Sequence, residues 1–173
     1  MTRDDFLDKQ YELSVQAGMN QRYHQRYATW YWQWDAGIKA VTAAAAVIGL
    51  ALSIATAFPN SNPYLVGAEV FLAIVTTVAA VVLNVIPVGN WEQFHRDFFR
   101  QWTDLREELE SLLYECQGEP DSPHIMQLQK LEGKMHRICG QEPSPNDNLI
   151  RICFEAEKKS RKAADEAQAQ AAA

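Results

Sequence analysis

Residues 38–58 read IKAVTAAAAVIGLALSIATAF, residues 59–63 read PNSNP, and residues 64–86 read YLVGAEVFLAIVTTVAAVVLNVI. Each apolar run is a little over twenty residues long. At about 1.5 Å per residue, a helix of that length crosses a hydrocarbon core of roughly 30 Å. The short link with its two prolines can join only antiparallel neighbours. These residues therefore predict a transmembrane helical hairpin.

The alternative is a pair of core helices buried in a soluble protein. Neither run has a polar face wide enough to meet water, and the 173-residue chain offers little else to surround them. A secretory signal peptide is excluded by position, because polar and aromatic residues 1–37 precede the first run. We therefore predict an all-α membrane protein, in which cytoplasmic helices flank the hairpin and form a helical bundle or coiled-coil-like oligomer.

Outside the hairpin the chain is polar and acidic. It carries 22 Asp and Glu against 16 Lys and Arg, a formal net charge of −6. General nucleic-acid binding needs a basic surface that displaces counterions, so this balance argues against it. The three cysteines are widely spaced and form no C-x-x-C pair, which predicts reduced cytosolic thiols rather than a disulfide framework.

The sequence divides into four segments. Residues 1–37 predict an amphipathic helix that ends in the aromatic run YHQRYATWYWQWD (23–35). Such a run is typical of a belt at the membrane interface, whereas base stacking on these rings would need more positive charge nearby. Residues 38–86 form the hairpin, with spans at 38–58 and 64–86. Residues 87–159 form a cytoplasmic helical region, and residues 160–173 form a polar tail of Ala, Lys, Glu and Gln.

Five basic residues flank the hairpin. Arg22, Arg26 and Lys39 precede it, Arg96 and Arg100 follow it, and the link between the spans has none. By the positive-inside rule, both termini are cytoplasmic in a bacterial inner membrane. The same side chains form a basic collar, and guanidinium groups suit phosphate oxygens. The collar therefore has two alternative roles: it orients the hairpin in the membrane, or it binds a phosphate-bearing ligand.

Each span carries a stripe of polar and small residues. A carboxylate in hydrocarbon costs at least ~2.5 kcal/mol, so Glu69 is expected to face protein or water, unless it snorkels to the far interface. The weaker stripe of the first span suits either a pore lining or close packing of the two helices. The candidate pore-lining residues are Asp35, Thr42, Gly49, Ser53, Thr56, Glu69, Thr76, Thr77, Ala80 and Asn84.

The segment from Trp91 to Cys116 repeats apolar residues every seven positions, which predicts a long helix with a coiled-coil-like seam. We expect this seam to join copies of the chain. Two further helices are predicted, one over Pro123–Cys139 and one that starts near Leu149 after a cap at Asn146 or Asp147. The residues assigned to the oligomer seam are Trp91, Phe98, Trp102, Leu105, Leu109 and Leu112.

No pattern predicts catalysis. The sequence holds no Gly-rich phosphate loop, nucleophile elbow or H-E-x-x-H motif, so we expect no enzyme activity, no catalytic residue and no cofactor. The pair His136-x-x-Cys139, with His124 or Cys116 as further donors, is spaced too loosely to predict a zinc site. We therefore expect no bound metal.

The order of these features resembles the SLATT family, two-helix membrane effectors of prokaryotic defence systems. The resemblance covers about Gln21 to Lys159. It consists of the Arg22/Arg26 aromatic helix before the first span, the short polar link, and the long Trp- and Arg-bearing helix after the second. It ends with QEPSPNDNLIRICFEAEK (141–158), which is similar to the acidic-proline element and short helix of the family.

The resemblance implies a homo-oligomeric pore that depolarises the membrane and arrests or kills an infected cell. It also implies control by a nucleotide or oligonucleotide signal, or by a partner nucleotidyltransferase. Two spans cannot enclose water alone, so a pore requires several copies about an axis, a tetramer or larger. The alternative is a non-conducting membrane scaffold that recruits a soluble partner enzyme. The polar stripes favour the pore, because a scaffold has no use for them.

Overall fold

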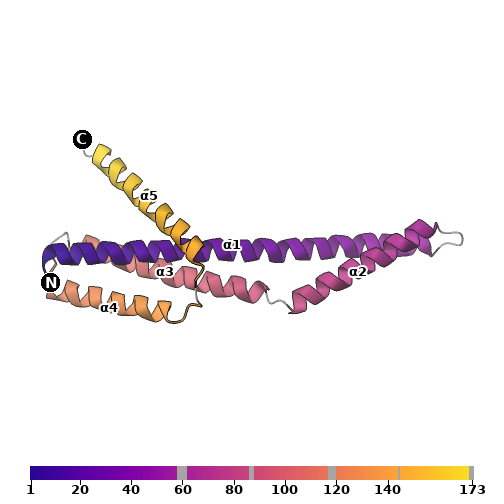
Figure 1. The fold of residues 1–173 in the computed structure, drawn as a ribbon, viewed down its shortest axis with the longest axis horizontal. Coiled ribbons are helices and arrows are strands. Elements are labelled where there is room, and N and C mark those ends of the chain that lie inside the picture. Colours follow the sequence, from indigo (N-terminus) through magenta and orange to yellow (C-terminus); the bar gives the residue numbers. More distant parts are fainter. Residues whose placement is uncertain (58–61, 86–87, 117–119, 144, 172–173) are drawn as a thin grey trace. The chain divides into compact units, whose positions relative to one another are not determined.

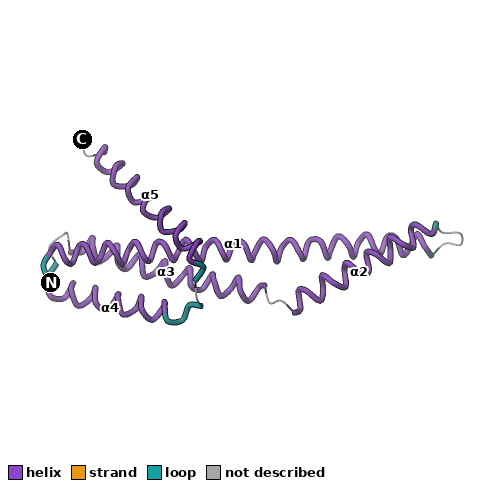
Figure 2. The backbone as a smooth tube through the Cα atoms, viewed as in Figure 1, coloured by secondary structure: helices purple, strands orange, loops and turns teal. Residues whose placement is uncertain are grey.

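The computed structural model describes residues 1–57, 62–85, 88–116, 120–143 and 145–171. Within these residues the chain forms five helices (Figures 1 and 2). The prediction of an all-helical fold is therefore confirmed. The helices are α1 (Arg3–Thr56), α2 (Pro63–Val85), α3 (Val88–Cys116), α4 (Ser122–Cys139) and α5 (Asp147–Ala171).

Side-chain caps fix where several helices begin. Asp121 caps α4, because its carboxylate accepts a hydrogen bond from the backbone N–H of His124 at 3.1 Å. The His124 ring in turn accepts from the backbone N–H of Asp121, which closes a capping box. At α5, the Asn146 side chain accepts from the N–H groups of Asn148 and Leu149. The cap predicted at Asn146 or Asp147 therefore falls on Asn146.

Helix α1 continues without a break through the boundary that we predicted at residue 37. Its 54 residues include no proline, and the glycine at that boundary, Gly37, is tolerated inside the helix. Residues 1–37 and the first span thus form one element. The boundary marks a change of composition rather than a change of secondary structure. Helix α5 likewise extends through most of the polar tail, to Ala171.

The described chain divides into two compact units, which are treated separately below. Unit 1 comprises Met1–Tyr27 and His95–Ala173, and unit 2 comprises Ala28–Phe94. Unit 1 has a hydrophobic core built by α1, α3 and α4, with one contribution from α5. The core side chains include Phe6 and Leu13 of α1, Trp102, Leu105, Leu109 and Leu112 of α3, Leu128 and Leu131 of α4, and Cys153 of α5.

The seam predicted on α3 lies inside this core. Trp102, Leu105, Leu109 and Leu112 are fully buried within a single chain, and Phe98 is 5% exposed. We expected the seam to join copies. Instead α1 and α4 supply the covering apolar surface, and α1 also contributes Gln10, whose side-chain amide donates to the Leu109 carbonyl at 2.9 Å. Of the six seam residues, Trp91 belongs to unit 2 and is 44% exposed.

Unit 2 contains the two predicted spans. Both α1 and α2 are long and apolar enough to cross a membrane. Only 6% of the apolar stretch of α1 and none of that of α2 is buried within the chain. Large apolar side chains such as Val47, Leu50 and Phe71 are more than 60% exposed. The chain therefore does not bury these helices as a soluble core of its own.

Candidate functional site

Three polar residues of the hairpin, Ser53, Thr56 and Glu69, meet near the link between α1 and α2. The Ser53 hydroxyl donates to Glu69 Oε1 at 2.5 Å, and the Thr56 hydroxyl donates to Glu69 Oε2 at 2.8 Å. Ser53 and Thr56 are three residues apart and so share one face of α1. We call Ser53, Thr56 and Glu69 the Glu69 triad. Glu69 remains partly exposed and Ser53 is exposed, so the triad forms a polar patch on the hairpin surface.

The threonine hydroxyls of the predicted stripes bond within their own helices. The hydroxyls of Thr42, Thr76 and Thr77 each donate at 2.8 Å to the backbone carbonyl four residues earlier. This local bond satisfies the hydroxyl hydrogen within the helix. Asp35 pairs with Lys39 at 2.6 Å, while Gly49 and Ala80 are partly exposed. The side chain of Asn84 lies outside the described residues.

The predicted basic collar is divided between the units. Lys39 belongs to unit 2 and pairs with Asp35, and the other four residues belong to unit 1. Arg22 binds Glu157, and Arg100 lies 3.7 Å from Asp97. Arg26 and Arg96 are exposed. Arg22, Lys39 and Arg100 are thus paired with carboxylates of the same chain.

The partner of Arg22 belongs to a charge cluster that the sequence did not reveal. Glu157 of α5 is completely buried. Its carboxylate accepts from Arg22 Nε of α1 at 2.7 Å and from Arg161 Nε of α5 at 3.0 Å, and Arg106 of α3 lies 3.6 Å away. We call these four residues the Glu157 clamp. It connects α1, α3 and α5.

The chemistry of the clamp explains how a carboxylate tolerates complete burial. Burial alone would raise the pKa of Glu157, but the hydrogen bond from Arg22 and the charges of Arg106 and Arg161 outweigh it and lower that pKa. Gly18 of α1 permits the close approach, since a Cβ there would stand 2.4 Å from Glu157 Oε1. In the sequence, the spacing of four between Glu157 and Arg161 is the only visible signal, and it is common on solvated helices.

A second buried polar cluster lies beside the end of the aromatic run. His24 and His95 face each other with their Nδ1 atoms 2.9 Å apart. His24 Nε2 lies 3.0 Å from Glu142 Oε1, and the Trp102 indole N–H donates to the same oxygen. Burial and the neighbouring His24 lower the pKa of His95 to about 4, although the charge of Glu142 opposes them. His95 is therefore neutral at physiological pH.

Among the described residues, no three His, Cys, Asp or Glu side chains are placed to hold a metal ion together. His136 and Cys139, the strongest metal pattern in the sequence, are both exposed on α4. His124 instead takes part in the α4 capping box.

No family model matches the chain, and the searches of curated proteins and of solved structures give no significant match. The resemblance to the SLATT family stays a prediction from the residues quoted above.

Proposed function

We propose that the protein is a pore-forming membrane effector, in which several copies assemble their hairpins around an ion-conducting path. The assignment to prokaryotic antiviral defence rests on the resemblance to the SLATT family. The pore rests on the Glu69 triad, a carboxylate with two hydroxyl partners on the surface of a mainly apolar hairpin. The proposed location is the bacterial inner membrane.

Membrane insertion is supported by apolar surface that the chain leaves uncovered. The exposed valine, leucine and phenylalanine side chains of α1 and α2 would destabilise a water-soluble protein, because apolar surface is worth about 25 cal/mol per Å² when it leaves water. Connectivity supports the topology. Unit 1 contains the residues before the hairpin and those after it, so an inserted hairpin leaves both termini on one side. The flanking arginines favour the cytoplasmic side.

The Glu69 triad supports a pore over an isolated hairpin. Two hydroxyl donors satisfy part of a carboxylate's hydrogen-bonding capacity but do not neutralise its charge. Such a group is unfavourable against hydrocarbon and needs water or protein on its exposed side. In an oligomer, copies of Glu69 would form a ring at the mouth near the α1–α2 link. A carboxylate ring concentrates cations at the entrance and repels anions, so the proposed pore prefers cations.

Planar-bilayer recordings of the purified protein test this function. We expect Glu69→Gln to lower cation conductance, by up to roughly tenfold at low salt and less at high salt because salt screens the ring. Glu69→Lys should shift the reversal potential towards anion preference. Glu155→Gln is the matched control, because it removes one carboxylate charge from the exposed surface of α5 in unit 1.

The outcomes separate three cases. If Glu69→Gln and Glu69→Lys match the parent in conductance and reversal potential, Glu69 snorkels to the interface and does not line the path. If the parent itself carries no current although it is inserted, the scaffold alternative replaces the pore. A changed selectivity in the Glu69 variants, with Glu155→Gln unchanged, supports the proposal.

Control by a nucleotide-type signal or by a partner nucleotidyltransferase is also part of the proposal, and it too rests on the family resemblance. The clamp constrains where such a ligand binds. A phosphate that uses Arg22 must share it with Glu157, whereas Arg26 is exposed on the same helix. We therefore expect loss of ligand binding in Arg26→Gln without loss of folding, measured by calorimetric titration with nucleotides.

A further inference from the structure

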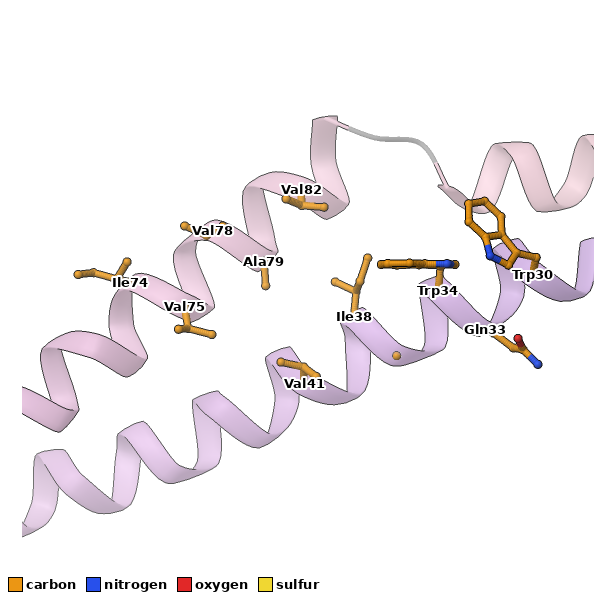
Figure 3. A pocket seen from close by; sticks show the side chains of 11 residues that line it. Trp30, Gln33, Trp34, Ile38, Val41, Ile74, Val75, Val78, Ala79 and Val82 are labelled. Carbon is orange, nitrogen blue, oxygen red and sulfur yellow. The ribbon is translucent and has the colours of Figure 1, made fainter. Parts of the chain in front are cut away.

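A cleft of about 710 Å³ lies between α1 and α2 within unit 2 (Figure 3). The side chains that line it are mostly apolar and largely exposed. Trp34 is 54% exposed, and Val41, Ile74 and Val78 are each 56% exposed, although all of them line the same cleft. An apolar space of this size falls in the range of roughly 300–1,000 Å³ that is typical of small-molecule sites.

The cleft is a wedge that is closed at one end. The two helices are tied together by the hydrogen bonds of the Glu69 triad near the link. Figure 3 shows them further apart where Trp34 of α1 and Val82 of α2 line the cleft. The opening is thus at the end where α1 enters the predicted span, and the narrow end points towards the middle of the hairpin.

The polarity of the lining changes along the wedge. Gln33 and the indole groups of Trp30 and Trp34 line the open end, and only aliphatic side chains line the deeper part. Tryptophan rings concentrate at the level of lipid headgroups, with the apolar part of the ring facing the hydrocarbon. The lining therefore follows the polarity of a single lipid leaflet, from its interface to its acyl chains.

We infer that this cleft binds one acyl chain of a phospholipid, taken from the leaflet in which residues 30–38 enter the membrane. The inference rests on the proposed insertion of the hairpin. A water-soluble ligand is disfavoured, because such sites fix their ligands with several convergent polar groups and the deep part of this cleft has none. A phospholipid chain needs no polar partner at depth.

A helix from a second copy does not fit the space. A helix with its side chains is about 10 Å in diameter, too wide to follow a wedge that narrows to the contact between α1 and α2 at the Glu69 triad. An extended acyl chain is thinner than a helix. The lipid would separate α1 and α2 at the open end while the Glu69 triad holds them together at the other end.

Native mass spectrometry of the detergent-purified full chain tests this site, with one phospholipid of defined chain length added back as the probe. We expect a phospholipid that stays bound to each parent chain. Val78→Trp fills the cleft from α2 and should lower lipid occupancy at least about tenfold, since each methylene displaced removes roughly a factor of four in affinity. Val81→Trp adds the same bulk to α2 at a residue that does not line the cleft and is 54% exposed, so its occupancy should match the parent.

Retention of the lipid by Val78→Trp, or its absence from the parent, overturns the inference. Equal loss in Val78→Trp and Val81→Trp also overturns it, because the loss would then not depend on the cleft. Carbonate extraction of the source membranes reports insertion independently. A protein that is inserted and conducts ions but retains no phospholipid contradicts this inference alone, whereas a protein that is extracted by carbonate contradicts the proposed function as well.

Discussion

At the scale of single residues, the completely buried Glu157 carboxylate of unit 1 needs the positive charges of its arginine partners. A buried carboxylate is stable only while its cationic partners stay in place, and removal of one partner of a buried pair typically costs 3–5 kcal/mol. Here the cationic partners come from α1, α3 and α5, so removal of the Glu157 carboxylate would weaken contacts among three helices that are far apart in the sequence. The clamp therefore controls the docking of α5.

The first prediction concerns this clamp. Glu157→Gln should lower the free energy of unfolding by about 3 kcal/mol, because Arg22 and Arg161 lose their shared anion. Gly18→Ala should also destabilise, although alanine favours helix by about 1 kcal/mol, since its Cβ would displace the Glu157 carboxylate. Urea unfolding followed by circular dichroism measures both. The control Glu166→Gln removes an exposed charge from α5 and should have little effect, and a stabilised Gly18→Ala would contradict the close contact.

The second prediction concerns pH. The pKa of His95 is lowered to about 4 in the fold, so between about pH 6.5 and pH 4 the unfolded chain binds more protons than the folded one. Stability should therefore fall as pH drops through this window, by on the order of 2–3 kcal/mol. The groups that face His95 are His24, Glu142 and Tyr27. The lowered pKa of Glu157 adds a further loss at more acidic pH.

The physical reason is the contact between the two imidazoles. At an Nδ1–Nδ1 distance of 2.9 Å only one hydrogen fits between the rings, so His24 and His95 cannot both be fully protonated without losing that hydrogen bond. His95→Asn removes the titrating group and should flatten the pH dependence of the melting temperature. His136→Asn, on the exposed surface of α4, should keep the parent profile. An unchanged profile in His95→Asn would assign the pH dependence to other groups.

At the scale of elements, sequence periodicity predicted the helices and their apolar faces, but it did not predict which helices pack against one another. The seven-residue repeat predicted that α3 is a helix with one apolar face. The structure has that face, since Leu105, Leu109 and Leu112 are all buried. This part was predictable because helical geometry alone places such residues on one side. The surface that covers this face was not predictable, because an apolar stripe can pack equally well against a second copy of the chain or against α1 and α4 of the same chain. Likewise, Glu157 and Arg22 are 135 residues apart, and no local pattern connects them.

The hairpin shows the same limit. Length and composition predicted α2 closely, and the residues 64–86 of the prediction compare with Pro63–Val85 in the structure. The Glu69 triad was predicted only in part. The stripes contained all three of its residues, but the hydrogen bonds between the helices depend on a rotation of α2 against α1 that sequence periodicity does not set. The remaining stripe residues were selected by the same periodicity, and among them Thr42, Thr76 and Thr77 donate to the backbone of their own helix.

The third prediction separates an internal core from an oligomer contact. Leu105→Asp places a carboxylate in the core of unit 1 and should destabilise the chain by more than about 4 kcal/mol, because it leaves both a cavity and an unpaired buried charge. Leu113→Asp is the control, since Leu113 lies on the same helix and is 39% exposed. Thermal unfolding and mass in detergent are measured together. A folded Leu105→Asp chain that merely dissociates to monomers would restore the seam as a contact between copies.

At the scale of the whole molecule, the division of the chain into two units limits how an inserted hairpin could be placed. Residues on both sides of the hairpin, 1–27 and 95–173, build one compact unit with a shared core, so they cannot be separated by a bilayer without unfolding that core. An inserted hairpin would therefore place the link between α1 and α2 on the opposite side. The proposed pore then has one mouth near the Glu69 triad and the other near the Asp35–Lys39 pair.

The last prediction tests this topology through cysteine labelling. Cys139 is exposed in unit 1, whereas Cys116 and Cys153 are buried and should react slowly. Desolvation and the charge of Glu142 raise the pKa of the Cys139 thiol, so the reaction is run at mildly alkaline pH. In intact spheroplasts, a membrane-impermeant maleimide should label Asn62→Cys, which is exposed beside the link, and should not label Cys139. After permeabilisation Cys139 should react as well, while Cys139→Ser gives the background of the buried thiols. Labelling of Cys139 in intact spheroplasts would place unit 1 outside the cytoplasm. That result would contradict the proposed control of the pore by a cytoplasmic nucleotide signal.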